Sequence, residues 1–497
     1  MQYAYRHWTD PAPSYLCLLG DATYDPKNFL RFNVPDLVPS YSRYYDPNLD
    51  HQYVSDDFFG FLEGPGDILL DLVVGRLPAA NAAQAAALVS GKLRAFEGNR
   101  EFDMWRARAI LAADDANVRD RPDGLGNQHV EQMERKDHVY LPDPIERQKI
   151  YLNDFAFADT TRQSKPAARE ELIAQINRGA WLTDYIGHGS EDVLADEQLF
   201  RSIDASRLVN AARPTIFGTF SCTVGKFDEP TGDGLGELLL ELPQGGSAAS
   251  LAATDEAFGR PSTALNDDFV KYQFPLSPRV DSLRTSGLAL ALGKNENANT
   301  SEFSTRKYAY LGDPGLVPPL PRGRGVWEKG PLDSVVRGDI VMLRGHALAA
   351  GDTVPDTLST GIADVLILGP PIERRQTAPA NGAVIDYFVP GYTLFRGPVP
   401  LEGGAFEVRF VVPTDARIVG SGGRLRALLS EAGGLGVGLA VDSLRIATSP
   451  PTRVDVEPPT IRLRYPSAAD STLRPGDRLT IEIADSSGID LTRIDNA

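Results

Sequence analysis

Short apolar runs alternate with helical segments along the first 320 residues, and this alternation limits the fold more than any other feature of the sequence. Several runs are apolar almost throughout, which is typical of strands that helices cover on both faces. Repeated strand, helix and strand segments favour parallel strands joined by right-handed crossovers. The sequence therefore predicts an α/β domain with strands at 14–20, 67–75, 106–113, 180–187, 214–220 and 245–253.

Two segments between these runs have the pattern of helices. Residues 79–98 are rich in alanine and leucine, and residues 164–179 carry an apolar stripe. The second segment has Ser164 as a cap, Pro166 in the first turn and Gly179 at its end. We therefore expect a helix there with both ends defined.

The sequence changes character near residue 317, where PPLPRGRGVWEKGP is rich in proline and glycine. The short strand-like segments beyond it predict a β-sandwich of immunoglobulin-like type at 330–450. A second proline-rich segment, SPPTRVDVEPP, precedes residues 455–497, which we expect to be the truncated start of a further β domain. The α/β domain is expected over 1–318, with part of its N-terminal region missing from the chain.

The charge of the chain argues against nucleic-acid binding, and its hydropathy argues against a membrane-spanning segment. The chain has 50 lysine and arginine residues against 67 aspartate and glutamate residues, a formal net charge of −17 that argues against nucleic-acid binding. No apolar run approaches the roughly 18 residues of a membrane span, and the N-terminus lacks the apolar core of a secretory signal. We expect neither a nucleic-acid partner nor a membrane-spanning segment.

The chain has two cysteines, which excludes a disulfide framework. Cys17 lies inside the apolar segment YLCLL and is expected to be a small core residue. Cys222 instead follows the run PTIFGTF, at the start of a polar loop that contains glycine. A reactive thiol belongs in such a setting. The position of Cys222 favours a catalytic role for its thiol. The alternative is an inert, half-buried thiol.

His188 has an equivalent place, directly after the run AWLTDYIG. The carboxyl ends of parallel strands gather catalytic groups at one edge of a sheet. If the strands before His188 and Cys222 are neighbours, the imidazole and the thiol open into one cleft. Such a pair suits acyl transfer, with a thiolate as nucleophile and an imidazolium that protonates the leaving amine. The alternative for His188 is a turn histidine bonded to a loop carbonyl.

Glycines flank this histidine on both sides. Gly187 and Gly189 permit backbone conformations closed to other residues and bring main-chain N–H groups close to a ligand. We expect the N–H groups of Gly189 and Cys222 to form an oxyanion hole. Asp255 and Glu256 follow the last apolar run and are a candidate acidic pocket for a basic substrate side chain.

Several segments together resemble the gingipain-type cysteine peptidases, a caspase-like family. In matching order over nearly all of the first 320 residues, they are YLCLLGDATYDPKN, SDDFFGFLEG, LLDLVVGRLPA, YIGHGSE, SCTVGKFDEP, GELLLELPQGG and YLGDPGL. More narrowly, SDDFFG, the HGSE and cysteine-loop pattern and the trailing β domains resemble the PorU-type sortase of the type IX secretion system. The resemblance implies a caspase-like peptidase that removes C-terminal sorting domains from exported proteins.

The resemblance also implies roles for single residues. His188 is the implied general acid and base, Cys222 the nucleophile and Gly189 an oxyanion donor. Ser221 and Thr223 flank the cysteine, unlike relatives with adjacent cysteines, so one nucleophile candidate remains.

Three acidic residues are candidates for a third catalytic member or a specificity pocket. Asp114 and Asp115 follow an earlier strand, at a position from which acidic residues reach the active site in gingipain relatives. Glu191 belongs to the shared HGSE pattern, but chemistry does not fix its role. The alternative for each is a solvated loop carboxylate or a turn cap.

The resemblance further implies polypeptide substrates, other secretion-system proteins as partners and surface lipopolysaccharide as an acceptor. It implies an extracellular or outer-membrane surface location in a Gram-negative bacterium. No cofactor is expected to be required, and a structural calcium ion is the one metal that the resemblance allows.

Other functions have weaker support. No G-x-S-x-G nucleophile elbow occurs, which argues against a serine hydrolase. Gly232, Gly234 and Gly236 follow no strand directly, so a helix cap is favoured over a nucleotide loop. Two acidic groups lack the spacing of a calcium loop: Asp56 with Asp57, and Asp228 with Glu229 and Asp233. The alternative of another class is a non-catalytic cell-surface module in which a caspase-like fold is a binding scaffold.

Overall fold

The computed structural model of the chain contains two compact units, one formed by residues 1–320 with 375–387 and the other by 321–374 with 388–497. It describes all residues except 47–50, 65, 100–102, 116, 119–120, 123–125, 159–163, 258, 275–283, 322, 329–331, 350–353, 379–381, 415–418, 432–435, 453–457, 465–479 and 485–497. None of the helices in the described ranges has the length and apolar character needed to cross a membrane.

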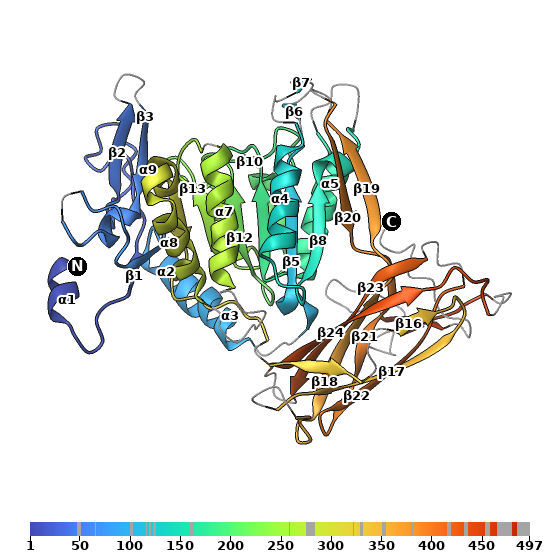
Figure 1. The fold of residues 1–497 in the computed structure, drawn as a ribbon. Coiled ribbons are helices and arrows are strands. Elements are labelled where there is room, and N and C mark those ends of the chain that lie inside the picture. The colour runs from blue at the N-terminus through green and yellow to red at the C-terminus, as the bar shows by residue number, and fades with distance from the viewer. Residues whose placement is uncertain are drawn as a thin grey trace. The chain divides into compact units, whose positions relative to one another are not determined.

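An eight-stranded sheet lies at the centre of the first unit (Figure 1). Its order is β1 (Tyr15–Leu19), β4 (Val73–Leu77), β14 (Tyr308–Leu311), β13 (Ser247–Ala253), β12 (Thr215–Phe220), β9 (Leu182–Ile186), β5 (Arg108–Ala113) and β8 (Glu146–Tyr151). The last five strands of this order are parallel, as predicted. However, β14 is antiparallel to β13 and parallel to β4, so the sheet is mixed. An apolar pattern predicts a strand but not its direction, which is why the reversal was not predicted.

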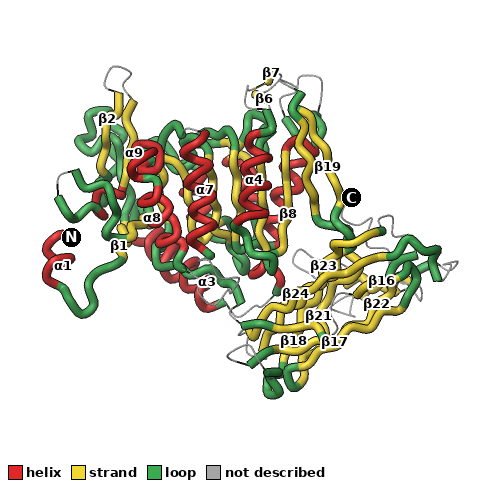
Figure 2. Tube along the Cα trace, viewed as in Figure 1, coloured by secondary structure: helices red, strands yellow, loops and turns green. Residues whose placement is uncertain are grey.

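Helices cover both faces of this sheet (Figures 1 and 2). One face carries α4 (Gln128–Val139), α7 (Gly259–Gln273), α8 (Ser286–Glu296) and α9 (Ala298–Arg306). On the other face, α5 (Pro166–Arg178) and α6 (Leu235–Glu241) pack into one core cluster. This cluster includes Leu172 of α5, Leu239 of α6 and Phe217 of β12. The apolar stripe expected at 164–179 therefore faces the sheet.

Deviations from the predicted strands have local causes. Of the run predicted as a strand at 67–75, only the end belongs to β4. Asp67 accepts the backbone N–H groups of Glu63 and Leu69, at 3.0 and 3.1 Å, and thereby forms a turn. A carboxylate that binds nearby amides competes with strand pairing.

The two predicted helices are both present. The segment 79–98 is helical in three parts, α2 (Ala82–Ala86), the π-helical η2 (Ala87–Leu93) and α3 (Arg94–Gly98). The predicted cap at Ser164 is wrong, because α5 begins at Pro166 after Lys165 and has no side-chain cap. Gly179 ends α5 with a φ of +98°, as its position predicts.

The expectation that Cys17 is a core residue is wrong. β1 is an edge strand, and Tyr15, Cys17 and Leu19 are exposed on one of its faces. The alternate residues Leu16 and Leu18 pack against a core cluster. An apolar run does not reveal whether one or both faces of its strand are covered.

The second unit is built of strands, as the sequence predicts. Its eight-stranded sheet has the order β15 (Gly325–Trp327), β17 (Ile340–Ala347), β22 (Ala405–Val411), β21 (Thr393–Glu402), β18 (Gly361–Leu368), β23 (Gly420–Glu431), β24 (Gly436–Ile446) and β16 (Leu332–Val335). In β22, Phe406, Val408 and Phe410 point into the core, and their neighbours are exposed or half-buried. β25 (Thr460–Arg464) and β26 (Thr480–Ala484) form an antiparallel pair. The immunoglobulin-like type and the further β domain stay predictions.

β19 (Ile372–Thr377) and β20 (Val384–Val389) form a two-stranded sheet, and the segment 375–387 belongs to the first unit. The Tyr387 hydroxyl donates to Asp154 Oδ1 at 2.6 Å, and the Tyr387 ring lies edge-on to the Tyr151 ring with centroids 5.1 Å apart. Gln376 Nε2 also donates to Asp154 Oδ1 at 3.0 Å, and Asn127 Nδ2 donates to the Ala383 carbonyl oxygen at 3.1 Å, so several polar contacts and one aromatic contact hold these strands.

We expect Tyr387→Phe to lower the free energy of unfolding of the first unit by about 1 kcal/mol, because it removes the hydrogen bond and keeps the ring. Urea denaturation measures this change. Tyr3→Phe is the control, because the Tyr3 side chain is 71% exposed. Equal unfolding midpoints for the two variants would contradict the expectation.

Candidate active site

β9 and β12 are adjacent parallel strands, and they bring His188 and Cys222 to the same edge of the sheet. Ile186 pairs with Phe220 at the ends of these strands, and each candidate lies two residues further along its chain. The Gly187 amide donates to the Phe220 carbonyl oxygen at 3.5 Å and continues the pairing. Neighbouring strands are about 4.8 Å apart, so the imidazole and the thiol start from neighbouring backbone positions.

The backbone of His188 is held by Asp114, which is buried. Asp114 Oδ2 accepts the His188 N–H at 2.8 Å, and the Tyr185 hydroxyl lies 2.7 Å from the His188 carbonyl oxygen. A Cβ at Gly187 would lie 2.3 Å from Asp114 Cβ and 2.4 Å from the Tyr185 hydroxyl, so this approach requires glycine. Burial and the neighbouring Asp115 carboxylate raise the pKa of Asp114. Asp114 therefore supports His188 through the main chain.

The other two acidic candidates are paired with lysines. Asp115 forms a buried ion pair with Lys165. Glu191 forms an ion pair with Lys226 at 2.9 Å, and its side chain is 40% exposed. The Asp114 carboxylate, in contrast to these lysine-paired groups, accepts the His188 N–H.

Cys222 is half-buried, and the segment after β13 borders its sulfur. Sγ lies 3.4 Å from the Ala257 amide nitrogen and 3.6 Å from the Ala257 carbonyl oxygen. Burial raises the pKa of the Cys222 thiol, while the Ala257 N–H and the Lys307 ammonium lower it. The thiol is therefore protonated near neutral pH, and forming the nucleophile requires a base.

Lys307 was not identified from the sequence. Its side chain is fully buried, forms an ion pair with Asp255 at 3.0 Å and donates to the Glu256 carbonyl oxygen at 2.7 Å. Because Asp255 is paired with a cation, the free acidic pocket expected at Asp255 and Glu256 is not formed as predicted. The feature of the sequence that could have indicated Lys307 is its position. It is the single residue between the end of a helix and the strand YAYL.

Two backbone N–H groups near these side chains are free to donate a hydrogen bond to a ligand. Within the described part of the chain, the N–H groups of Gly189 and Cys222 donate to no acceptor. Gly189 forms an antiparallel bridge with Leu194, but the hydrogen bonds of this bridge involve the residues on either side of Gly189. Both amides are therefore available to a substrate carbonyl oxygen at this edge.

The loop after Cys222 contains a strained turn. Thr223 has a φ of +51°, which is uncommon for a β-branched residue. Its N–H donates to the Asp255 carbonyl oxygen at 3.2 Å, and the Val224 N–H donates to the Cys222 carbonyl oxygen at 2.7 Å. Strain of this kind persists where the surroundings fix it, and here it sets the direction in which the chain leaves Cys222.

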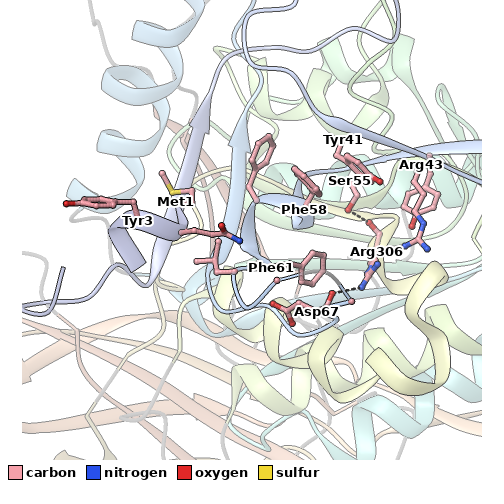
Figure 3. A pocket seen from close by; sticks show the side chains of 15 residues that line it. Met1, Tyr3, Tyr41, Arg43, Ser55, Phe58, Phe61, Asp67 and Arg306 are labelled. Atoms are coloured by element: carbon pink, nitrogen blue, oxygen red, sulfur yellow. Dashed lines mark hydrogen bonds between the residues drawn. The ribbon is translucent and has the colours of Figure 1, made fainter. Parts of the chain in front are cut away.

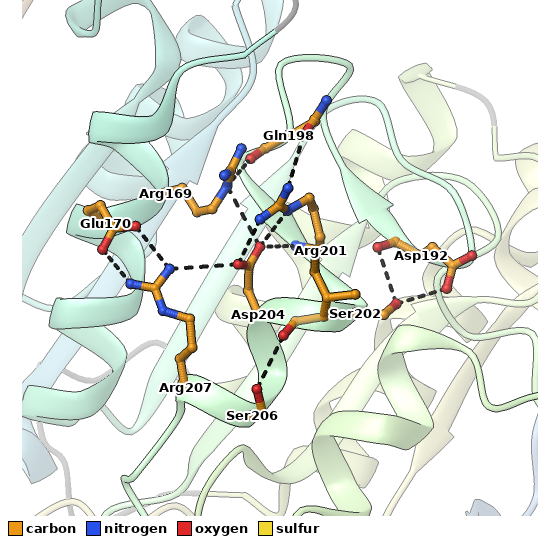
Figure 4. A network of polar contacts seen from close by, with 10 residues as sticks. Arg169, Glu170, Asp192, Gln198, Arg201, Ser202, Asp204, Ser206 and Arg207 are labelled. Atoms are coloured by element: carbon orange, nitrogen blue, oxygen red, sulfur yellow. Dashed lines mark hydrogen bonds and ion pairs between the residues drawn. The ribbon is translucent and has the colours of Figure 1, made fainter. Parts of the chain in front are cut away.

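The loop after His188 is anchored by a polar network (Figure 4). Buried Asp204 accepts hydrogen bonds from Arg201 at 2.8 and 3.0 Å and lies 3.7 Å from the guanidinium nitrogens of Arg169 and Arg207. Such a buried carboxylate with several cationic partners is costly to disturb. The network therefore fixes the β10 (Val193–Leu194) and β11 (Phe200–Arg201) hairpin that pairs with Gly189.

Three buried carboxyl groups near His188 lie close enough together to be compared with a calcium site. Asp114, Asp115 and Glu197 each offer an oxygen within 4.8 Å of the others. Lys165 already supplies a cation to Asp115. Burial, together with the Asp115 and Asp114 carboxylates, raises the pKa of Glu197 to about 8. Calcium takes about six to eight oxygen ligands, mostly charged or carbonyl, and this cluster does not fit it.

Cys222 is expected to react slowly with iodoacetamide at pH 7 and faster as the pH rises past about 9, because its pKa is raised above the usual value of 9.0 and the thiolate reacts. Intact-protein mass spectrometry in a Cys17→Ala background follows this single thiol. Lys307→Met should move the profile to still higher pH, because the ammonium lowers the pKa. A midpoint below that of free cysteine would contradict this expectation.

Comparison with known proteins gives one family. The model of Peptidase family C25 matches residues 1–319. No curated protein matches in sequence. One similar solved structure is the Arg-specific cysteine proteinase gingipain R, with a TM-score of 0.49 and 14% identity over 90% of this chain and 87% of that chain. Another is dimeric latent PorU from Porphyromonas gingivalis, with a TM-score of 0.33 and 16% identity over 97% of this chain and 42% of that chain. The family match includes both His188 and Cys222.

Proposed function

Since the chain belongs to peptidase family C25 and is therefore a cysteine peptidase, we propose that it is an endopeptidase in which Cys222 is the nucleophile and His188 the general acid and base. The observation that carries this proposal is the register of β9 and β12, which puts both residues two positions beyond the pair Ile186 and Phe220. The other cysteine, Cys17, is exposed on an edge strand.

The reaction begins with transfer of the Cys222 proton to the His188 imidazole. This step is needed because burial keeps the thiol protonated near neutral pH. The sulfur attacks the carbonyl carbon of the scissile bond, and the carbonyl π electrons move to its oxygen. The Gly189 and Cys222 N–H groups then donate to this oxyanion.

The tetrahedral intermediate collapses with cleavage of the C–N bond. The His188 imidazolium gives its proton to the leaving amine, and an acyl-enzyme remains on Cys222. His188 next removes a proton from water, whose oxygen attacks the thioester carbon. The C–S bond then breaks, the new carboxyl terminus is released, and the imidazolium returns its proton to the Cys222 sulfur. Asp114 fixes the histidine backbone during both steps through its bond to the His188 N–H.

The substrate class that we propose is exported proteins with C-terminal sorting domains, as for a PorU-type sortase at the cell surface. Support comes from the segments SDDFFG and HGSE together with the cysteine loop and the trailing β region. In such an enzyme an amine, for example on surface lipopolysaccharide, takes the place of water and forms a new amide. The balance of protons is the same, because His188 deprotonates the amine as it would deprotonate water.

The test is incubation of the purified protein with a polypeptide that ends in a sorting domain, followed by mass spectrometry of the products. We expect a single cut before the sorting domain, and an amide product when an amine acceptor is present. Cleavage without the amide product would restrict the function to hydrolysis. Tight binding of the polypeptide without any cleavage would favour the non-catalytic module instead.

A further inference from the structure

The SDDFFG segment, which the proposed reaction does not use, forms a rigid turn. η1 (Asp56–Gly60) is held by two buried ion pairs at its first residues. Asp56 accepts two hydrogen bonds from Arg76, both at 2.7 Å, and Asp57 accepts two from Lys294, at 2.6 and 2.8 Å. Charge-assisted bonds with two contacts fix direction as well as distance. The backbone that follows these carboxylates is therefore fixed.

This rigid turn presents an exposed aromatic ring. Phe58 is 50% exposed and Tyr41 is 41% exposed, although both are large rings. The two rings stack with centroids 4.3 Å apart and planes 7° apart. Aromatic side chains lose little conformational entropy on binding, and rigid exposed ones dominate recognition surfaces.

The stacked pair lines a pocket of about 740 Å³ (Figure 3). The wall combines α1 (Gln2–His7), β2 (Tyr41–Asp46), β3 (His51–Ser55), η1 and the loop after it, and Arg306 at the end of α9. This volume is in the range of small-ligand sites. Six of the fifteen lining residues are aromatic: Tyr3, Tyr41, Tyr53, Phe58, Phe59 and Phe61.

The charge of this wall is opposite to that of the chain. Arg43 and Arg306 line the pocket together with one carboxylate, that of Asp67, whereas the whole chain has a net charge of −17. The Arg306 guanidinium lies over the Phe61 ring at 4.5 Å from its centroid. An aromatic wall with cationic groups suits an aromatic group that carries or adjoins a negative charge.

The pocket is connected to the loop after Cys222 by side-chain and backbone contacts. Thr254 Oγ1 donates to the carbonyl oxygen of Val54 in β3 at 2.8 Å, and the next residue, Asp255, accepts the Thr223 N–H at 3.2 Å. Lys307 Nζ lies 5.8 Å from the centroid of the pocket-lining Tyr53 ring, and its charge lowers the pKa of Cys222. The pocket and the loop that carries Cys222 are therefore connected through the segment that follows β13.

From these observations we propose that the pocket is a substrate subsite that binds an aromatic side chain adjoining an acidic residue in an extended polypeptide. Phe58 and Tyr41 contact the aromatic ring, and Arg43 and Arg306 attract the carboxylate. This inference rests on the proposed endopeptidase function and adds the sequence that such an enzyme selects.

Fluorogenic peptides that differ at one position test the proposal. Phe-Asp, Phe-Lys and Ala-Asp pairs are moved in turn from two to six residues on either side of the cut. At one position we expect kcat/KM to be at least about tenfold higher for Phe-Asp than for Ala-Asp, with Phe-Lys between them. In Phe58→Ala this ratio should fall towards one, and in Phe58→Tyr it should be kept.

Phe29→Ala is the matched control, because Phe29 is 77% exposed and does not line the pocket. It should keep the ratio, and thermal unfolding of each variant shows whether the fold is intact. A ratio near one in the wild type, or an unchanged ratio in Phe58→Ala, overturns the subsite and leaves the proposed peptidase function standing.

Binding to a Cys222→Ala protein separates the two proposals. The Phe-Asp peptide, labelled for fluorescence anisotropy, should bind about tenfold more tightly than the Ala-Asp peptide, and the added Phe58→Ala change should remove the difference. If the wild type cleaves no peptide, the proposed function fails and this binding measurement alone decides the pocket. Equal binding of the two peptides then overturns the pocket as well.

Discussion

Replacement of Cys222 by alanine is expected to lower kcat for peptide cleavage by about 10⁴-fold or more. The acyl-enzyme cannot form without a thiolate, and the backbone amides alone supply only the remaining acceleration. The folded state should change little, because the half-buried side chain lies in a loop at the sheet edge and not in a core cluster. Steady-state kinetics on a fluorogenic peptide, with thermal unfolding in parallel, measures both effects.

Cys17→Ala is the matched control for this change. It removes the other thiol of the chain, on an exposed face of the edge strand β1, and should keep kcat within about twofold of the wild type. Full activity of Cys222→Ala, or loss of activity in Cys17→Ala, would show that the nucleophile is not Cys222.

His188→Ala should produce a loss of similar size. The thiol pKa is raised by burial, so without the imidazole both the formation of the thiolate and the protonation of the leaving amine fail. Because the two side chains act as a unit, the double variant should be no slower than the slower single one. Additive losses would mean that Cys222 and His188 act in different steps or at different sites.

The strands at the centre of the sheet could be predicted from the sequence because they are short runs with apolar residues on both faces of the strand. The runs that became β5, β9, β12 and β13 have both faces covered, so their pattern differs clearly from that of loops and helices. That His188 and Cys222 each follow such a run was also visible in the sequence. The adjacency of β9 and β12 was an assumption, because the order of strands is set by packing over the whole domain.

The remaining parts of the site depend on contacts between residues far apart in the sequence. Asp114 was identified as an acidic candidate, but its bond to the His188 N–H follows from the pairing of β5 with β9. Lys307 reaches Asp255, whose carbonyl oxygen accepts the Thr223 N–H next to Cys222, because β14 runs antiparallel to β13. Neither an apolar run nor the spacing of residues along the chain encodes such pairings. The SDDFFG segment was noted as a resemblance, whereas its buried ion pairs and its exposed ring are visible only in the structure.

Gly189→Ala tests the oxyanion hole with a single methyl group. A Cβ at this position would lie 2.7 Å from Ser221 Oγ and 3.0 Å from Ser221 Cβ, so one of the two loops has to move. The amides of Gly189 and Cys222 belong to these two loops, and their shared position relative to the substrate oxygen would be lost. We expect kcat to fall by about 10²- to 10³-fold with little change in KM, as for loss of one oxyanion donor.

A second substitution distinguishes this steric cause from a general disturbance. Ser221 is 3% exposed, and in the described residues its Oγ has no hydrogen-bond partner, so Ser221→Ala removes the nearest obstacle without breaking a bond. The double variant Gly189→Ala with Ser221→Ala should therefore recover about tenfold of the lost kcat. The recovery of kcat would show two things. The added methyl group lowers the rate through its clash with Ser221, and the positions of the Gly189 and Cys222 amides affect the reaction. If the double variant is as slow as Gly189→Ala and its unfolding midpoint is unchanged, the steric explanation is wrong. If Gly189→Ala is fully active, Gly189 is not part of the oxyanion hole.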